Sequence, residues 1–175
     1  MPHTTPLPGE VAPALRVERL GGETFDLAST AIDRYFAILF YRGVHCPACR
    51  KYLEELNGRL REFEDAGVGI VAVSMDLQDR AERQLAEWDI GRLRIGYAMD
   101  ERTARSFGLF VSEKIQDKEP DRFSEPGMVI VKPDRTIYAM FLQTVPWTRP
   151  DFGGLLSGLA FSTEKGFPPR GTAGV

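Results

Sequence analysis

The chain contains two cysteines, and only two residues separate them in the segment Cys46-Pro47-Ala48-Cys49. A thiolate is a nucleophile, and two thiols at this spacing can close an intramolecular disulfide. Structural zinc usually needs four ligands, whereas beyond this pair the chain offers only His3 and His45. A chance pair of buried structural cysteines is the other interpretation. We expect redox chemistry that uses no metal and no organic cofactor.

The residues around the cysteines predict where these lie in the fold. Residues 35–41 form a continuous apolar run, which is typical of a strand buried on both faces. Pro47 suits the first turn of a helix, where no backbone N–H is needed. The cysteines should therefore lie where a buried strand ends and a helix begins. The free N–H groups and partial positive charge of a helix N-terminus favour a thiolate over a thiol.

This helix predicts different roles for the two sulfurs. Its apolar stripe, at steps of three and four residues, consists of Leu53, Leu56, Leu60 and Phe63. Cys49 extends the stripe by one turn and should face the core, whereas Cys46 should lie at the helix cap, nearer solvent. Positive character is expected around the site from Arg42, His45, Arg50 and Lys51. We interpret Cys46 as the attacking thiolate and Cys49 as the buried resolving thiol.

Composition limits the class of protein. The 175 residues are most simply a single domain, 1–175, and 43% apolar with 27% charged residues is ordinary for a soluble globular chain. A formal net charge of −3 gives no support for nucleic-acid binding. No apolar run reaches membrane-spanning length, and the N-terminus lacks a signal-peptide pattern. We expect a cytoplasmic protein with neither membrane nor nucleic acid as a partner, in a reducing compartment where a cysteine pair serves catalysis.

The rest of the chain predicts further elements around the site. Strands are expected at residues 15–20, 23–27, 68–74, 95–99, 128–131 and 136–140. Helices are expected after Ser29, after a cap at Asp79, from 102 to 107 after a cap at Asp100, and from Pro150 or Asp151 onward. The helix after Asp79 should bury an apolar face made of Ala81, Leu85 and Trp88. Irregular segments are expected at the extended N-terminus 1–13, the loop or flap 109–125 and the tail 163–175. This order of elements predicts an α/β three-layer sandwich.

Five segments together resemble a known family. They are residues 9–15 with Gly22 and Leu27, the active-site run Phe40-Tyr41-Arg42-Gly43 into Cys46-Pro47-x-Cys49-Arg50, Asp100 with Ala104, Phe107 and Gly108, residues 126–134, and Arg149-Pro150-Asp151 with residues 167–171. On these residues the chain resembles the thioredoxin-fold redoxins, specifically the peroxiredoxin-like AhpC/TSA (alkyl hydroperoxide reductase/thiol-specific antioxidant) group with a Cys-Pro-x-Cys active site. The resemblance covers most of the length. It implies a thioredoxin-like three-layer sandwich with a central mixed β-sheet flanked by helices.

The active-site run also departs from the pattern of that family. A standard peroxiredoxin has Pro seven residues and Thr or Ser three residues before its peroxidatic cysteine, and these positions are Leu39 and Gly43 here. The hydroxyl that polarises the peroxide in the family is therefore absent. Cys49 stands where thioredoxins and glutaredoxins have their second cysteine, whereas most peroxiredoxins have a resolving cysteine far away in the sequence. The site thus resembles a redoxin body with a thioredoxin-type dithiol.

Three further residues are candidates for the site, each with an alternative. Arg42 can hold the thiolate or a peroxide oxygen by a charge-assisted hydrogen bond, or form a surface ion pair. His45 can tune Cys46 or relay a proton, or point to solvent. Pro126 stands where, by the resemblance, thioredoxin folds keep a cis-proline that faces the active site.

The resemblance and the dithiol lead to one main hypothesis. In it, the protein is a thiol-dependent antioxidant oxidoreductase: Cys46 attacks a hydroperoxide, Cys49 closes the disulfide, and a thioredoxin- or glutathione-type thiol reductant restores the pair. One alternative is a thiol-disulfide oxidoreductase whose substrates are disulfides. Another is a redox-sensing module without turnover, whose disulfide changes its affinity for a partner. A homodimer is expected only by analogy with the family.

Overall fold

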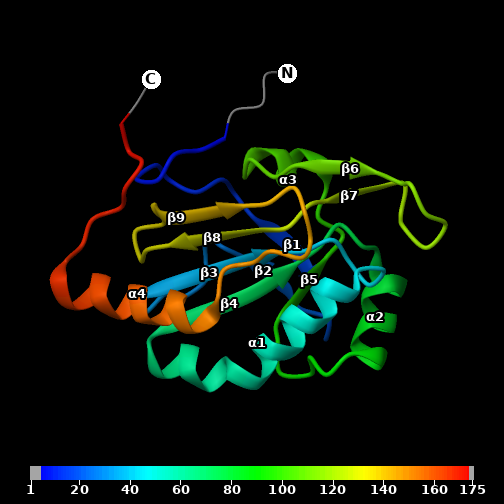
Figure 1. Cartoon of the computed structure of the whole chain (residues 1–175), viewed down its shortest axis with the longest axis horizontal. Coiled ribbons are helices and arrows are strands. Elements are labelled where there is room, and N and C mark those ends of the chain that lie inside the picture. The colour runs from blue at the N-terminus through cyan, green and yellow to red at the C-terminus, as the bar shows by residue number, and fades with distance from the viewer. Residues whose placement is uncertain (1–4, 174–175) are drawn as a thin grey trace.

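The central sheet is built from the strands that the apolar runs predicted. The computed structural model describes residues 5–173, and within them seven strands form one mixed sheet in the order β2-β1-β5-β4-β3-β8-β9 (Figure 1). These strands are β1 (Arg16–Arg19), β2 (Thr24–Asp26), β3 (Tyr35–Phe40), β4 (Val68–Val73), β5 (Ile95–Tyr97), β8 (Gly127–Val131) and β9 (Ile137–Leu142). The helices are α1 (Pro47–Asp65), α2 (Gln78–Glu87), α3 (Glu101–Ser106) and α4 (Phe152–Lys165).

Strand β3 lies inside the sheet and leads to the cysteines. All six of its residues are buried. It pairs in parallel with β4 and antiparallel with β8, so that Phe40 lies opposite both Val73 and Gly127. Side chains alternate along a strand, so Leu39 packs on one face of the sheet and Phe40 on the other. Burial on both faces explains why this run is apolar throughout.

Helices cover both faces of the sheet, which confirms the predicted α/β three-layer sandwich. On one face α1 and α4 lie next to each other (Figure 1), where the rings of Tyr52 and Phe152 stack with centroids 4.3 Å apart. On the other face Phe107, the C-cap residue of α3, has its ring 5.1 Å from that of Phe40. None of the helices in residues 5–173 is long and apolar enough to cross a bilayer.

The predicted short helix after Ser29 is wrong, because a turn takes its place. The Asp26 carboxylate accepts a hydrogen bond from Ala28 N at 2.9 Å, and the Thr30 hydroxyl donates to Asp26 O at 2.7 Å. Side-chain bonds of this kind satisfy the backbone locally and compete with a helix.

Helix α2 also differs from its prediction. It begins at Gln78 after Leu77, which caps it without a side-chain hydrogen bond, so Asp79 lies in the first turn and is not the cap. Gln84 is fully buried, whereas Leu85 is 42% exposed. Ala81 and Trp88 are buried as predicted, so only Leu85 departs from the predicted face. Gln84 is buried instead, and its amide oxygen accepts a hydrogen bond from the Tyr41 hydroxyl at 3.0 Å.

Residues 109–125 were expected to be an irregular loop or flap, and the structure adds two short strands to this segment. These strands form a second sheet, in which β6 (Val111–Glu113) pairs antiparallel with β7 (Arg122–Ser124). The strands are too short to give a clear periodic pattern, and their stability comes from the burial of Phe123, which is 1% exposed. We call this element the β6–β7 hairpin.

The two irregular ends pack more than expected. Gly9 N donates to Ile137 O at 2.8 Å and Ala12 N donates to Arg135 O at 2.9 Å, so the N-terminal segment runs beside the start of β9. Residues 1–4 of the expected extended segment lie outside the described residues. Helix α4 continues to Lys165, so the first residues of the predicted tail 163–175 are helical.

Candidate active site

The turn between β3 and α1 places Cys46 at the N-terminus of the helix, as predicted. Cys46 is the N-cap residue, and Pro47 follows in the first turn. The Cys46 Sγ accepts a hydrogen bond from the backbone N–H of Cys49 at 3.2 Å. The sulfur thus does what a Ser or Asp side chain does at other helix caps, and it receives the partial positive charge of the helix end.

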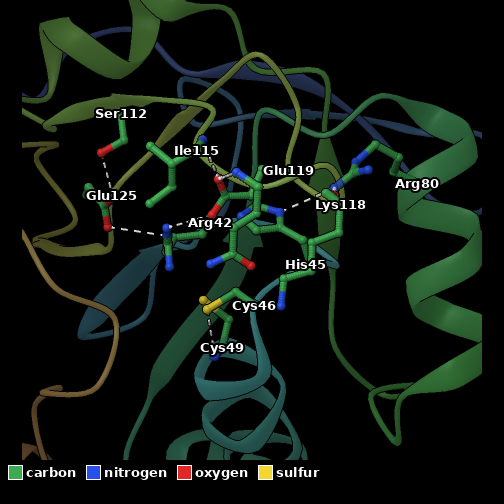
Figure 2. A network of polar contacts seen from close by, with 11 residues as sticks. Arg42, His45, Cys46, Cys49, Arg80, Ser112, Ile115, Lys118, Glu119 and Glu125 are labelled. Carbon is green, nitrogen blue, oxygen red and sulfur yellow. Dashed lines mark hydrogen bonds and ion pairs between the residues drawn. The ribbon is translucent and has the colours of Figure 1, made fainter.

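Both cysteines are buried, which corrects one expectation. Cys49 is fully buried as predicted, but Cys46 is only 2% exposed and does not lie nearer solvent. Cys46 is part of the core cluster that contains Val44, Tyr52 and Leu53. The β6–β7 hairpin lies against its neighbour His45, where the rings of Phe123 and His45 have centroids 4.8 Å apart. Both thiols are free, and their sulfurs lie beside each other (Figure 2).

The two thiols have opposite acidities. The pKa of Cys46 is lowered to about 6, chiefly because the Cys49 thiol donates a hydrogen bond to it, with further help from the Cys49 backbone N–H, Arg42 and Arg149. The pKa of Cys49 is raised well above its usual value, because burial and the hydrogen bond to the Cys46 thiolate oppose its ionisation. At neutral pH the pair therefore consists of a Cys46 thiolate and a Cys49 thiol.

Arg42 is an ion-paired residue at this site. Its Nη2 lies 3.4 Å from Glu119 Oε1 and its Nε lies 3.5 Å from Glu125 Oε2, and its guanidinium carbon lies 4.7 Å from the ring centre of Phe123 (Figure 2). The side chain is 16% exposed, and both carboxylates are more deeply buried. Arg42 therefore forms ion pairs, but they are buried and not the surface pair of the alternative. The guanidinium charge also lowers the pKa of Cys46.

His45 is buried and neutral, so it neither points to solvent nor adds positive charge. Burial lowers its pKa to about 4, and the charge of Arg80 acts in the same direction. Arg80 Nη2 lies 3.2 Å from His45 Nδ1 (Figure 2), which makes that nitrogen the acceptor. Within residues 5–173, His45 Nε2 is buried without a hydrogen-bond partner. A ring held in this way cannot donate a proton from an imidazolium at neutral pH.

The remaining positive charges expected around Cys46 are directed elsewhere. Arg50 pairs with Glu54 at 2.9 Å and donates to Glu87 O at 2.9 Å, which ties α1 to the end of α2. Lys51 is exposed. The positive field at Cys46 therefore comes from the helix end and from two arginines, of which only Arg42 was expected.

Gly43 fits its position because Asp76 occupies the space beside it. Gly43 has φ +124, and a Cβ at this position would overlap the Asp76 carboxylate. Asp76 is 1% exposed and accepts hydrogen bonds from Val44 N and Arg80 Nε, both at 2.7 Å. The backbone of this turn therefore disfavours the Thr or Ser that the family has here. Asp76 was not predicted, although a carboxylate just after β4, the strand next to β3, was a usable signal.

Pro126 differs from its prediction. It is buried between the β6–β7 hairpin and β8, but the peptide bond before it is trans. The chain runs in an extended form from β7 into β8, where Gly127 pairs with Phe40, and Pro126 O accepts a hydrogen bond from Gln143 N at 3.0 Å. A cis bond would interrupt this extended course.

The structure also brings unpredicted residues to the site. Arg149 Nη2 lies 3.1 Å from Cys49 Sγ, across 100 positions of sequence. Glu119 accepts hydrogen bonds from the backbone N–H of Ile115 at 2.8 Å and of Gln116 at 3.0 Å, and so shapes the tip of the hairpin. Ser112 donates to Glu125 at 2.7 Å (Figure 2). Residues 5–173 contain no group of three or more His, Cys, Asp or Glu side chains that could hold a metal ion.

Comparison with known proteins assigns the family. The model of the AhpC/TSA family matches residues 8–140, and the chain belongs to this family. No curated protein sequence gives a significant match.

Three peroxiredoxin structures illustrate this fold at low sequence identity. A cysteine-to-serine mutant of peroxiredoxin 6 of Arenicola marina is similar with a TM-score of 0.78 and 15% identity, covering 94% of this chain and 76% of that one. A peroxiredoxin-like protein from Aquifex aeolicus has a TM-score of 0.72 and 17% identity, covering 89% of this chain and 87% of that one. The AhpC of Mycobacterium tuberculosis has a TM-score of 0.73 and 13% identity, covering 94% of this chain and 96% of that one. These likenesses confirm the thioredoxin-like fold.

Proposed function

We propose that the protein is a thiol peroxidase of the AhpC/TSA family that uses an intramolecular dithiol. The Cys46 thiolate attacks one oxygen of a hydroperoxide, the O–O bond breaks, and water or an alcohol leaves with a proton. Cys46 becomes a sulfenic acid, which condenses with Cys49 to a disulfide and releases water. An external thiol reductant of thioredoxin or glutathione type then returns both cysteines to the reduced state.

The observation that carries this proposal is the pair of hydrogen bonds that Cys49 directs at one sulfur. Cys49 donates from its backbone N–H at 3.2 Å and from its thiol, and both interactions lower the pKa of Cys46. A thiolate that exists at neutral pH is the species that attacks peroxide. The second thiol lies in contact with it, where it can resolve the oxidised product.

Arg42 supports the proposal in place of the missing hydroxyl. A side chain at Gly43 would be strained in this turn, because Asp76 fills the space. The Arg42 guanidinium is one of the two cations that lower the pKa of Cys46. We assign it the polarisation of the peroxide, through a charge-assisted hydrogen bond to the oxygen that leaves.

The deep position of Cys46 favours a small substrate. The residue is 2% exposed, and its neighbour His45 packs against Phe123 of the β6–β7 hairpin. Hydrogen peroxide or a short organic hydroperoxide reaches such a sulfur with less rearrangement than a protein disulfide does. The close spacing of the dithiol supports a second candidate, a thiol-disulfide oxidoreductase, and the redox-sensing module is the third.

The test is stopped-flow Trp fluorescence of the reduced protein mixed with hydrogen peroxide, followed by a count of free thiols. Trp147 is a suitable reporter because it is 75% exposed and lies two residues before Arg149, which contacts Cys49. One equivalent of peroxide should remove both thiols in the wild type. Cys49→Ser should stop at a sulfenic acid that dimedone traps, and Cys46→Ser should not react.

The alternatives predict other results. Oxidation no faster than that of free cysteine at the same thiolate fraction would refute the peroxidase. Rapid reduction of disulfides by the same protein would then support the oxidoreductase, whereas slow turnover of every oxidant would support the sensor. We propose a reducing compartment, the cytoplasm, for the reaction. A homodimer stays a prediction, which sedimentation velocity tests.

A further inference from the structure

The segment between β9 and α4 brings a guanidinium to the buried thiol of the pair. Arg149 Nη2 lies 3.1 Å from Cys49 Sγ. Cys49 is fully buried, so the sulfur receives this interaction inside the protein, where a charge acts more strongly than in water. A guanidinium is always protonated and donates without accepting. It therefore stabilises Cys49 as a thiolate and offers little to Cys49 as a thiol.

Contacts with α1 and with its own segment hold Arg149 in this position. Its Nε donates to Pro146 O at 3.1 Å, and its guanidinium carbon lies 5.2 Å from the ring centre of Tyr52 on α1. The Tyr52 hydroxyl donates to Pro150 O at 2.6 Å and fixes the same segment to α1. Asp151 then caps α4. The guanidinium is therefore oriented before any reaction begins.

The charges around Cys49 change during the reaction. In the reduced protein the Cys46 thiolate accepts a hydrogen bond from the Cys49 thiol, and this contact and burial keep the pKa of Cys49 high. The other groups that act on Cys49 are Arg149 and the backbone N–H of Arg42, while the buried Tyr41 phenol stays neutral because burial raises its pKa. Once Cys46 is oxidised or blocked, its negative charge is lost. The Arg149 charge remains.

We propose that Arg149 is a catalytic residue of the resolving step, whose guanidinium stabilises the Cys49 thiolate while it attacks the Cys46 sulfur. This inference rests on the proposed role of Cys49. The S–S bond forms as the S–O bond of the sulfenic acid breaks, and the leaving hydroxide takes up the proton that Cys49 released. Cys49 is oxidised, the Cys46 sulfur is reduced, and Arg149 keeps its protons throughout.

Methyl methanethiosulfonate tests this step without any peroxide. The small reagent transfers a methylthio group to the Cys46 thiolate, and methanesulfinate leaves. Cys49 then attacks the Cys46 sulfur, the bond to the methylthio group breaks, and methanethiol leaves. Acid quenching at set times and intact-protein mass spectrometry separate the reduced, methylthio and disulfide forms, so each step has its own rate. Cys49→Ser should accumulate the methylthio form.

Removal of the charge should slow the second step selectively. Arg149→Met should slow disulfide closure by about ten-fold or more and move its pH dependence to higher pH, whereas methylthiolation of Cys46 should change far less. Arg149→Lys should restore part of the closure rate. Arg59→Met is the matched control, because this arginine lies on α1 and pairs with Glu62 at 2.8 Å. It should leave both steps unchanged.

Two results would overturn the inference. One is closure by Arg149→Met at the wild-type rate with the wild-type pH dependence. The other is a loss of closure rate in Arg149→Met that accompanies a fall in Tm and that Arg149→Lys does not recover. This result would indicate a structural role. If Arg149→Met does not fold, the closure rates of Arg149→Gln and Arg149→Lys provide the same comparison of a neutral with a charged side chain. A protein that closes its disulfide through Arg149 but reacts slowly with peroxide would refute only the peroxidase.

Discussion

Cys46 and Cys49 share a single negative charge at neutral pH, and Cys49 has two roles in the proposed cycle. In the reduced protein its thiol and its backbone N–H stabilise the Cys46 thiolate. After oxidation of Cys46 the same sulfur becomes the nucleophile. The substitution chosen at position 49 therefore affects the acidity of Cys46 as well as the resolving step.

The acidity of Cys46 should follow the donor at position 49. In the wild type the rate of alkylation by iodoacetamide should rise with pH, reach half its maximum near pH 6 and level off above it, because the thiolate is the reactive form. Cys49→Ala removes the thiol donor and should raise the apparent pKa of Cys46 towards its ordinary value of about 8.5. Cys49→Ser keeps a hydroxyl donor and should lie between the two. If the alkylation rate reached half its maximum at the same pH in all three proteins, this account would be contradicted.

At the scale of elements, the β3–α1 turn and the β6–β7 hairpin form the site together. The turn depends on Gly43 and on the buried Asp76 carboxylate, which binds Val44 N and Arg80 at 2.7 Å. The hairpin supplies Glu119, which pairs with Arg42. Each element can be tested by a variant that leaves both cysteines in place.

Gly43→Ala should destabilise the protein. Its φ of +124 is unfavourable for an L side chain, and the added Cβ overlaps the Asp76 carboxylate. We expect a loss of about 1–3 kcal/mol in the free energy of unfolding, measured by urea denaturation. Gly58→Ala is the matched control, because Gly58 lies within α1 with open space around it and should gain up to about 1 kcal/mol. Unchanged stability of Gly43→Ala would mean that the turn relaxes freely.

Glu119→Ala should open the hairpin over Cys46. This substitution removes the acceptor of two backbone N–H groups at 2.8 and 3.0 Å and one of the two carboxylates paired with Arg42. The reaction of Cys46 with a bulky aromatic disulfide should then accelerate several-fold more than its reaction with iodoacetamide. The exposed Glu113 on β6 provides the control, Glu113→Ala, which should change neither rate. Equal acceleration with both reagents would indicate a change in acidity instead of access.

At the scale of the whole molecule, the thiolate links the stability of the reduced protein to pH. The folded-state pKa of Cys46 is about 6, below its unfolded value of about 8.5. A group whose pKa is lowered by folding contributes stability that is fully present above the unfolded pKa. That contribution is lost as the pH falls through the folded pKa. Between pH 6 and 8.5 the unfolded state therefore binds more protons at this site than the folded state.

Comparison with Cys46→Ser should reveal this linkage. The difference in unfolding free energy between the reduced wild type and Cys46→Ser should increase with pH over this window, by up to about 1.4 kcal/mol per pH unit. Urea denaturation in the presence of a phosphine reductant measures it, because the titrations of groups distant from Cys46 cancel in the difference. A difference that stays constant from pH 6 to 8.5 would show that the thiolate is not stabilised by folding.

Local sequence patterns alone determined the centre of the fold and the place of the dithiol. The apolar run 35–41 predicted β3 because burial on both faces requires it, and Pro47 with the stripe through Phe63 predicted α1. The N-cap position of Cys46 and the burial of Cys49 follow from this junction. These features depend on neighbours within a few residues in the chain, so periodicity and capping contain the necessary information.

Tertiary structure decided what surrounds the sulfurs. The β6–β7 hairpin was not predictable, because its three-residue strands show no clear period and are stabilised by the burial of Phe123 against distant groups. Phe123 also packs against His45, whose burial keeps it neutral. Contacts that join distant parts of the chain, such as Arg42 with Glu119 and Arg149 with Cys49, leave no local pattern. The acidity of each thiol depends on such contacts and on burial, and both arise only when the chain folds.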